Sequence, residues 1–220
     1  MTEHDHPEHN SNASAAEVWD EKYRTRARIW SGEPNPQLIA EAAALRPGTA
    51  IDLGCGEGAD AIWLASRGWK VTALDVSAVA LERAETHAKD RGQGGTIEWV
   101  RQDLATWVPG ELFDLVTAQF LHATAMPWQQ ALQLAAAAVR TGGTLLIVGH
   151  HPAGLPPWGT QHHAPDKFYT AEQLAQELGI EAPAWRLDVA DSRHRNATGP
   201  DGEAAALTDA VLRATRLAAR

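Results

Sequence analysis

The chain has 220 residues, of which 44% are hydrophobic, and its 28 acidic residues outnumber its 19 lysines and arginines, leaving a formal charge of −9. A chain of this length buries most of the surface that its unfolded form exposes, which excludes a wholly disordered protein. The negative balance, with no basic stripe, argues against a nucleic-acid partner. The single cysteine, Cys55, cannot close a disulfide within the chain, and no apolar run is long enough to cross a bilayer. These features predict a cytoplasmic globular protein without a membrane partner.

The first residues are polar and turn-forming, and we expect residues 1–14 to be a flexible leader. Its three histidines could hold a metal, although a solvated tail is the simpler interpretation. Residues 15–220 are expected to form a single domain, in which 15–46 make an N-terminal lid and helix.

Two short helices are predicted in that N-terminal part. Trp19 and Tyr23 stand four residues apart and would share one face of a helix over 15–26. After a break that contains glycine and proline, Asn35 is a cap for a helix over 36–45, with proline in its first turn.

Beyond residue 48, short apolar runs alternate with helical stretches, which is typical of a parallel sheet covered by helices. The expected strands are 49–53, 70–74, 96–100, 112–118 and 144–148. The expected helices are 59–66, 77–91, which Ser77 would cap, and 128–139.

The last third of the chain follows a different pattern. Residues 150–166 are rich in proline, glycine and histidine and predict a long loop of the kind that is often functional. A capping box at Thr170 begins a helix that ends at the next glycine. The β-like stretches 185–190 and 207–217 flank the turn-forming segment 196–202 and predict an antiparallel pair, although the second is alanine-rich and could also be a helix.

The most informative segment is Asp52–Gly58, which reads Asp-Leu-Gly-Cys-Gly-Glu-Gly and lies between a predicted strand and a predicted helix. Glycines at such a turn allow positive φ and let a ligand lie against bare backbone. In doubly wound sheets this edge is where ligands collect. Asp75 follows the second strand and is placed to accept hydrogen bonds from ribose hydroxyls; a simple helix cap is its structural alternative.

The turn alone does not identify the nucleotide, because Gly54, Gly56 and Ala59 also satisfy the dinucleotide pattern G-x-G-x-x-G/A. Asp52 just before the turn would oppose a pyrophosphate but suits a ligand with sulfonium and ammonium groups. Asp103 after the third strand can accept from the amine of adenine. The C-terminal antiparallel pair is also absent from the dinucleotide layout, and together these features favour a sulfonium nucleoside.

The sequence resembles the class I S-adenosylmethionine-dependent methyltransferases. The resemblance is carried by Asp52–Gly58, Asp75, Asp103–Leu104 and Phe113–Val116, and it is strong over about 47–148. It implies an α/β fold with a doubly wound, mostly parallel seven-stranded sheet, an antiparallel last strand and helices on both faces in a three-layer sandwich. The antiparallel pair predicted independently at the C-terminus agrees with that layout.

The resemblance assigns cofactor roles by position. The glycine loop would hold the methionine part of S-adenosyl-L-methionine, the acid after strand two the ribose, and the acid after strand three the adenine. The expected cofactor site comprises Trp19, Tyr23, Trp30, Asp52, Gly54, Cys55, Gly56, Gly58, Asp75, Val76, Asp103, Leu104 and Gln119. Within it, Cys55 is interpreted as a small packing residue rather than a nucleophile. Asp114 is interpreted as structural.

The aromatic N-terminal segment resembles the one that folds over the cofactor in thiol, thiopurine and tellurite-resistance methyltransferases. Trp19, Tyr23 and Trp30 are therefore lid candidates, since aromatic faces attract a sulfonium by about 0.5–2 kcal/mol. Core anchors of an N-terminal helix are the alternative.

A His-Arg pair in the tellurite-resistance methyltransferases matches His194 and Arg195 here, and the resemblance implies that these two residues face the methyl acceptor. The chain lacks the further arginine of that pattern and has Asp201–Ala204 instead, which makes an oxyanion acceptor less secure. A basic surface turn is the structural alternative for Arg193–Arg195.

Histidines follow two of the strand ends and continue into the long loop. His122 and His150 could act as a base or contact the acceptor, because carboxyl ends of strands face the active crevice. His151 follows the same strand end as His150, and His162 and His163 are interpreted as solvated loop residues. The paired histidines could instead bind zinc, but such a site would need a demonstrated convergence of three or four ligands.

The sequence thus predicts methyl transfer to a small-molecule acceptor, and the resemblance of the N-terminal segment slightly favours a thiol or other chalcogen compound. A thiolate acceptor needs no strong base. The catalytic candidates are His122, His150, His194 and Arg195, with no metal. The alternatives are an O- or N-methyltransferase with His122 or His150 as base, a nicotinamide-dependent oxidoreductase that uses the same turn, and a cofactor-binding protein without turnover.

Overall fold

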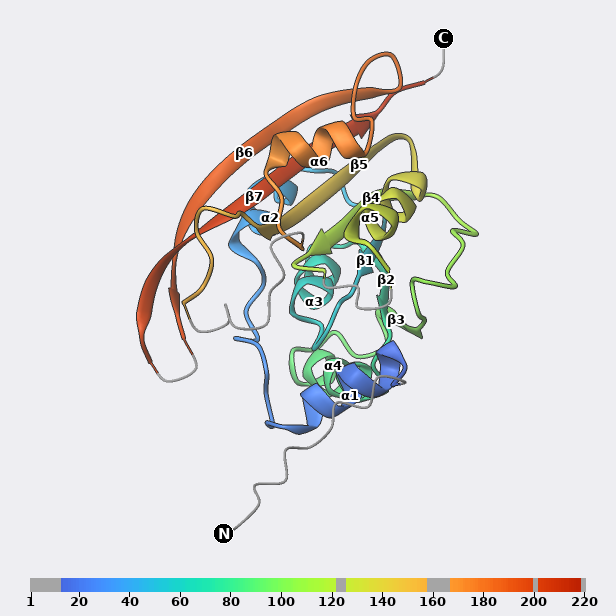
Figure 1. Cartoon of the computed structure of the whole chain (residues 1–220). Coiled ribbons are helices and arrows are strands. Elements are labelled where there is room, and N and C mark those ends of the chain that lie inside the picture. The colour runs from blue at the N-terminus through green and yellow to red at the C-terminus, as the bar shows by residue number, and fades with distance from the viewer. Residues whose placement is uncertain (1–12, 122–125, 158–166, 200–201, 219–220) are drawn as a thin grey trace.

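The computed structural model of the chain describes residues 13–121, 126–157, 167–199 and 202–218. One sheet crosses the molecule and helices lie on both of its faces (Figure 1). The strands are β1 (Thr49–Leu53), β2 (Lys70–Asp75), β3 (Ile97–Arg101), β4 (Phe113–Gln119), β5 (Val139–His150), β6 (Trp185–Thr198) and β7 (Ala204–Arg216). The helices are α1 (Ala15–Arg24), α2 (Pro36–Ala42), α3 (Ala59–Ser66), α4 (Ala78–Asp90), α5 (Trp128–Ala137) and α6 (Ala171–Glu177). Within the described ranges, no helix combines the length and apolarity that a membrane crossing requires.

The seven strands are ordered β3-β2-β1-β4-β5-β7-β6. The first five are parallel, whereas β7 runs antiparallel to both β5 and β6. The predicted fold class is therefore confirmed. Strand order reverses between β1 and β4, and ligands of doubly wound sheets bind beyond the carboxyl ends of the strands at such a point.

Each face of the sheet has its own apolar core. On one face, Leu132 of α5 and Leu174 of α6 pack against strand residues such as Leu145. On the other face, Leu38 of α2 and Leu64 of α3 lie in the second cluster, which α4 also joins. All five leucines are fully buried. The carboxyl edge between the two layers is left for loops, and these carry the candidate site.

Local sequence signals account for the helix starts. Ser77 accepts a hydrogen bond from the backbone of Ala80, Asn35 accepts one from Gln37, and Thr170 forms the expected capping box. Predicted and observed helix bounds agree to within a few residues.

The C-terminal strands are longer than predicted. β6 and β7 form a long curved ribbon, here called the C-terminal ribbon (Figure 1). Its strand pairing continues to Thr198 and Ala204, so the connecting turn is shorter than the predicted 196–202. The alanine-rich stretch is a strand, as predicted. It pairs on both sides, so sheet packing overrides the helix propensity of alanine.

Gly58 shows what the turn requires of the sequence. It is the N-cap of α3 with φ of 85°, and a Cβ there would lie 2.8 Å from both Ala84 Cβ and Trp99 Cη2. We expect Gly58→Ala to lower the free energy of unfolding by roughly 2–4 kcal/mol, because overpacking adds to the left-handed backbone cost.

Gly92 is the matched control for that prediction. It also has positive φ, but a Cβ there would meet nothing within 4 Å. Gly92→Ala should therefore cost only the backbone term, roughly 1–2 kcal/mol. Urea denaturation of both variants measures the difference, and equal losses would show that packing around Gly58 is not tight.

Candidate functional site

The N-terminal segment lies directly on the glycine turn. Tyr23 of α1 is buried, and its hydroxyl would be 2.9 Å from a Cβ on Gly56. Trp30 donates from Nε1 to that hydroxyl over 3.1 Å. Lys22 stacks over Trp30 and over Trp19, whose ring centroid is 6.1 Å from that of Tyr23. The structure therefore brings the three predicted aromatic residues together beside the turn.

Carboxylates anchor this segment. The buried Glu57 accepts hydrogen bonds from the backbone of Ile29 and Trp30, each at 3.1 Å, and pairs with Arg83 at 3.0 Å. Asp20 of α1 accepts from Ser77 Oγ at the start of α4. The sequence interpretation missed these roles. Glu57 lies inside the motif, which was the available signal, but its partners are more than 25 residues away.

Asp75 connects the turn to the start of α4. Its Oδ2 accepts from the Gly56 backbone over 2.8 Å and its Oδ1 accepts from the Ser77 backbone over 2.9 Å. Burial raises the pKa of this carboxyl group, against the lowering effect of those hydrogen bonds. Each carboxylate oxygen can accept more than one hydrogen bond, so holding the turn leaves capacity for a ligand hydroxyl.

Two polar side chains beside the turn have buried atoms without a hydrogen-bond partner in the described part of the chain. Asp52 Oδ1 accepts from Thr117 Oγ1 over 2.9 Å, but its Oδ2 has no partner. Both polar atoms of the Gln119 amide, at the end of β4, are also unpartnered. Unsatisfied buried groups of this kind are uncommon and mark places where a ligand can supply the missing partner.

The buried environment of Asp52 disfavours the ionised form of its carboxyl group. Burial, and after it the negative charge of Asp60, raises the pKa of Asp52 to about 8, although the Thr117 hydrogen bond lowers it. Asp60 itself accepts from the Asn35 backbone over 2.6 Å, and burial raises its pKa to about 6. A cationic ligand group beside Asp52 would favour its ionised form.

This pKa predicts a pH dependence of stability. Between about pH 4 and pH 8 the native protein keeps a proton on Asp52 that the unfolded chain has released, so the free energy of unfolding falls as pH rises. Asp52→Asn should remove this contribution, which is at most about 1.4 kcal/mol per pH unit. Urea denaturation from pH 5 to pH 8 should show the free energy of unfolding of the variant increasing relative to that of the wild type as pH rises. If the two free energies changed with pH in parallel, the prediction would be wrong.

The remaining predicted cofactor residues lie along the same edge. Leu74 accepts hydrogen bonds from the backbone of both Gly54 and Cys55. Burial raises the pKa of the Cys55 thiol well above its ordinary value, which disfavours a thiolate nucleophile. Asp103 is half-buried and accepts from the Ala105 backbone, and Leu104 is buried.

Val76 directly follows β2, and its carbonyl accepts from Arg101. Asp114 lies near the opposite end of its strand, bonded to Thr49 and paired with Arg140, in line with a structural role.

A second group of side chains lies at the carboxyl ends of β4 and β5. We call it the Phe120 cluster: Phe120, His150, Phe168, Arg195 and Asp209. The rings of Phe120 and His150 are 4.4 Å apart and those of His150 and Phe168 are 6.4 Å apart. Arg195 Cζ lies 5.3 Å from the Phe120 ring and its Nε donates to both oxygens of the Asp209 carboxylate. Two predicted residues, His150 and Arg195, thus lie in one cluster.

His194 lies apart from that cluster. Because side chains alternate along a strand, Arg193 and Arg195 share one face of β6 and His194 has the other. His194 is exposed, with Nδ1 3.1 Å from Thr208 Oγ1, whereas Arg193 pairs with Glu41 of α2. The strand continues through all three residues, so they are not part of a surface turn.

The other predicted histidines either bond locally or lie outside the described residues. His151 Nδ1 accepts from the Ala153 backbone over 3.0 Å. His122, His162 and His163 lie outside the described residues. Within the described residues, no group of three or more His, Cys, Asp or Glu side chains is arranged to hold a metal.

Residues 50–143 match a protein-family model described as "Methyltransferase domain". The match contains the glycine turn, Asp75 and Asp103. The chain contains a class I methyltransferase domain. A probable thiol methyltransferase 2 from Arabidopsis thaliana is 32% identical to it over 101 residues, which are 44% of this chain and 45% of the relative. The chain therefore spans less than half the length of this relative.

The likeness to solved structures extends beyond the matched segment 50–143 and covers most of the chain. One comes from work on conversion of a disulfide bond into a thioacetal group during echinomycin biosynthesis. It has a TM-score of 0.70 and 26% sequence identity, and the match covers 92% of this chain and 91% of the solved chain. Another is an S-adenosylmethionine-dependent methyltransferase from Thiobacillus denitrificans in complex with S-adenosylhomocysteine, with a TM-score of 0.59 and 20% identity over 80% of this chain and 73% of its own. At 20% identity, the second structure shows only that the fold is shared.

Proposed function

We propose that the protein transfers a methyl group from S-adenosylmethionine to a small organic thiol. The observation that carries the proposal is the combination of the glycine turn, held by Asp75, with the unpartnered Oδ2 of buried Asp52 beside it. A nucleoside with a cationic methionine tail would supply Asp52 with the positive partner that the described residues do not provide.

The residues present fit this cofactor. Glycines at 54, 56 and 58 all have positive φ, a backbone conformation that residues with a side chain rarely adopt. The Asp75 carboxylate and the half-buried Asp103 carboxylate lie at the ends of β2 and β3, where the ribose and adenine would bind. When bound, the cofactor supplies a methyl group on a sulfonium, which is electrophilic without further activation.

The chain's own contribution is alignment and exclusion of water. The N-terminal segment would cover the sulfonium with Tyr23 and Trp30, which Glu57 holds in place. The acceptor thiol gives its proton to solvent and its sulfur takes the methyl group, while the electron pair of the broken bond stays on the donor sulfur. Such a step needs no strong base.

The choice of a thiol is supported by the relative named as a thiol methyltransferase. An O- or N-methyltransferase would instead need a base, for which His150 is the described candidate. The position of His150 between the rings of Phe120 and Phe168 favours packing over proton transfer.

A screen of acceptors tests the proposal. Protein supplied with methyl-labelled S-adenosylmethionine should label small thiols in preference to phenols, amines, selenite and tellurite. His150→Gln should leave the pH dependence of the rate with thiols unchanged, because no base at His150 takes part in the step. Labelling of a phenol or amine that is lost in His150→Gln would replace the proposal by its O- or N-methyltransferase alternative, and tight cofactor binding with no labelled product would point to a protein without turnover.

A cytoplasmic location is part of the same proposal. It is supported by the single cysteine in 220 residues, which suits a reducing compartment.

A further inference from the structure

The Phe120 cluster contains an ion pair whose charges balance. Arg195 Nε donates to the two carboxylate oxygens of Asp209 over 3.0 and 2.8 Å, and Asp209 is 0% exposed. Burial raises the pKa of Asp209, against the lowering effects of Arg195 and Gln37. The positive charge of Arg195 is thus already paired with a carboxylate where it meets the Phe120 ring.

The position of this pair relates it to the glycine turn. Phe120 follows Gln119 at the end of β4, and the next side chain, Leu121, fills the space that a Cβ on Gly54 would occupy. Phe120 has φ of 49°, although bulky residues rarely adopt positive φ. Strained backbone of this kind is concentrated at ligand sites, which favours a functional position for the ring.

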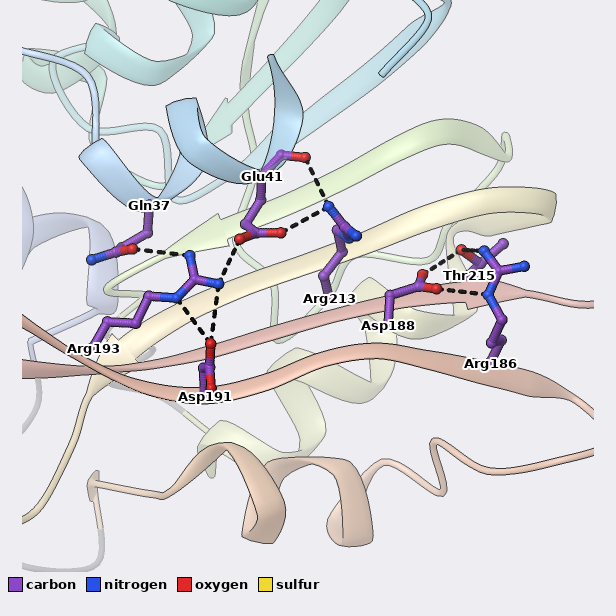
Figure 2. A network of polar contacts seen from close by, with 8 residues as sticks. All are labelled: Gln37, Glu41, Arg186, Asp188, Asp191, Arg193, Arg213 and Thr215. Atoms are coloured by element: carbon purple, nitrogen blue, oxygen red, sulfur yellow. Dashed lines mark hydrogen bonds and ion pairs between the residues drawn. The ribbon is translucent and has the colours of Figure 1, made fainter. Parts of the chain in front are cut away.

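Two further basic side chains of the described ranges, Arg193 and Lys167, are also balanced or screened. Arg193, on the same face of β6, pairs with Glu41 at 2.6 Å and with Asp191 at 3.3 Å (Figure 2). Lys167 precedes Phe168 but is exposed, so water and salt screen its charge. The residues outside the described ranges contain no lysine or arginine other than Arg220. The cluster therefore offers an acceptor an aromatic surface and a guanidinium with little net charge.

We propose that Asp209 determines the charge preference of the acceptor site. With Arg195 balanced, the site takes an aromatic or apolar thiol that carries no charge beyond its reacting sulfur, and it discriminates against acceptors with a carboxylate, a sulfonate or an oxyanion. This inference rests on the proposed function and adds the class of acceptor. Asp209 acts through Arg195 and is a positioning residue in this account.

A matched pair of acceptors tests the inference. Thiophenol and 4-sulfanylbenzoate differ by one carboxylate, and the ratio of their kcat/KM values is compared between variants so that intrinsic reactivity cancels. The wild type should favour thiophenol. Asp209→Asn leaves Arg195 unbalanced and should move the ratio toward 4-sulfanylbenzoate by about ten-fold or more.

Two further variants separate charge from damage to the fold. Arg195→Gln leaves Asp209 with a neutral hydrogen-bond donor and should move the ratio the opposite way, so the test stands even if Asp209→Asn does not fold. Asp188→Asn removes a carboxylate from the same ribbon, where it pairs with Arg186 and accepts from Thr215 (Figure 2), and should leave the ratio unchanged.

The outcomes distinguish this inference from the proposed function. A wild type that favours 4-sulfanylbenzoate, or a ratio that Asp209→Asn and Arg195→Gln do not change, overturns the role of Asp209 while leaving thiol methylation in place. No thioether from either acceptor contradicts the proposed function instead. In that case, calorimetric binding of thioanisole and 4-(methylsulfanyl)benzoate to protein loaded with S-adenosylhomocysteine still measures the charge preference.

Discussion

Replacing Asp75 by alanine is expected to weaken binding of S-adenosylhomocysteine by about 1.5–3 kcal/mol, a rise in Kd of roughly 10- to 150-fold. The variant would lose the charge-assisted bonds that we propose between Asp75 and the ribose hydroxyls. It would also release the Gly56 and Ser77 backbone groups that the two oxygens hold at 2.8 and 2.9 Å, so that the turn is less well ordered for binding.

The measurement is calorimetric titration of folded protein, with Asp114→Ala as the matched control. Asp114 is a half-buried carboxylate near the opposite end of the sheet, where it accepts from Thr49 and pairs with Arg140. That control should lose stability but keep its Kd. An unchanged Kd in folded Asp75→Ala would remove Asp75 from the binding site.

Replacing Glu41 by alanine is expected to cost about 2–4 kcal/mol of the free energy of unfolding. Glu41 on α2 is buried and pairs with Arg193 at 2.6 Å and Arg213 at 2.8 Å, and it thereby joins α2 to the C-terminal ribbon (Figure 2). Its removal leaves two guanidinium groups without this partner. Their side chains are 24% and 29% exposed, so water recovers part of the loss.

Asp188→Ala is the control, because Asp188 lies on the same ribbon but its partner Arg186 is 62% exposed. Exposed ion pairs contribute at most about 1 kcal/mol. Urea denaturation of both variants should therefore show a clearly larger loss for Glu41→Ala, with S-adenosylhomocysteine binding retained. Equal losses would mean that the contacts between α2 and the ribbon do not depend on Glu41.

The parts of the fold that local sequence determines could be predicted. Ser77, Asn35 and Thr170 cap helices through hydrogen bonds to residues two or three positions away, which a sequence pattern contains directly. The glycine turn could be predicted for the same reason, because its glycines and the neighbouring strand and helix follow one another closely in the sequence. The C-terminal ribbon was predicted too short, since its Asn-Ala-Thr residues favour turns locally and only long-range pairing keeps them in a strand.

The residues that the structure brings together around the glycine turn could be predicted from sequence, and those of the Phe120 cluster much less so. Glu57, Gln37 and Asp209 act through partners far along the chain, and no spacing rule connects them. Likewise, the separation of His194 from Arg195 depends on the strand continuing through Thr198, after which alternation alone assigns their faces. From the sequence alone, without knowing that the strand continues, His194 and Arg195 look like neighbours in one turn.

The binding specificity of the glycine turn is tested most directly by titrating S-adenosylhomocysteine and NAD separately into one preparation of the wild-type protein. We expect S-adenosylhomocysteine to bind at a single site and NAD to give no saturable heat. Saturable binding of NAD in preference to S-adenosylhomocysteine would contradict the proposed site for a methionine-bearing nucleoside and would favour a nicotinamide-dependent enzyme instead.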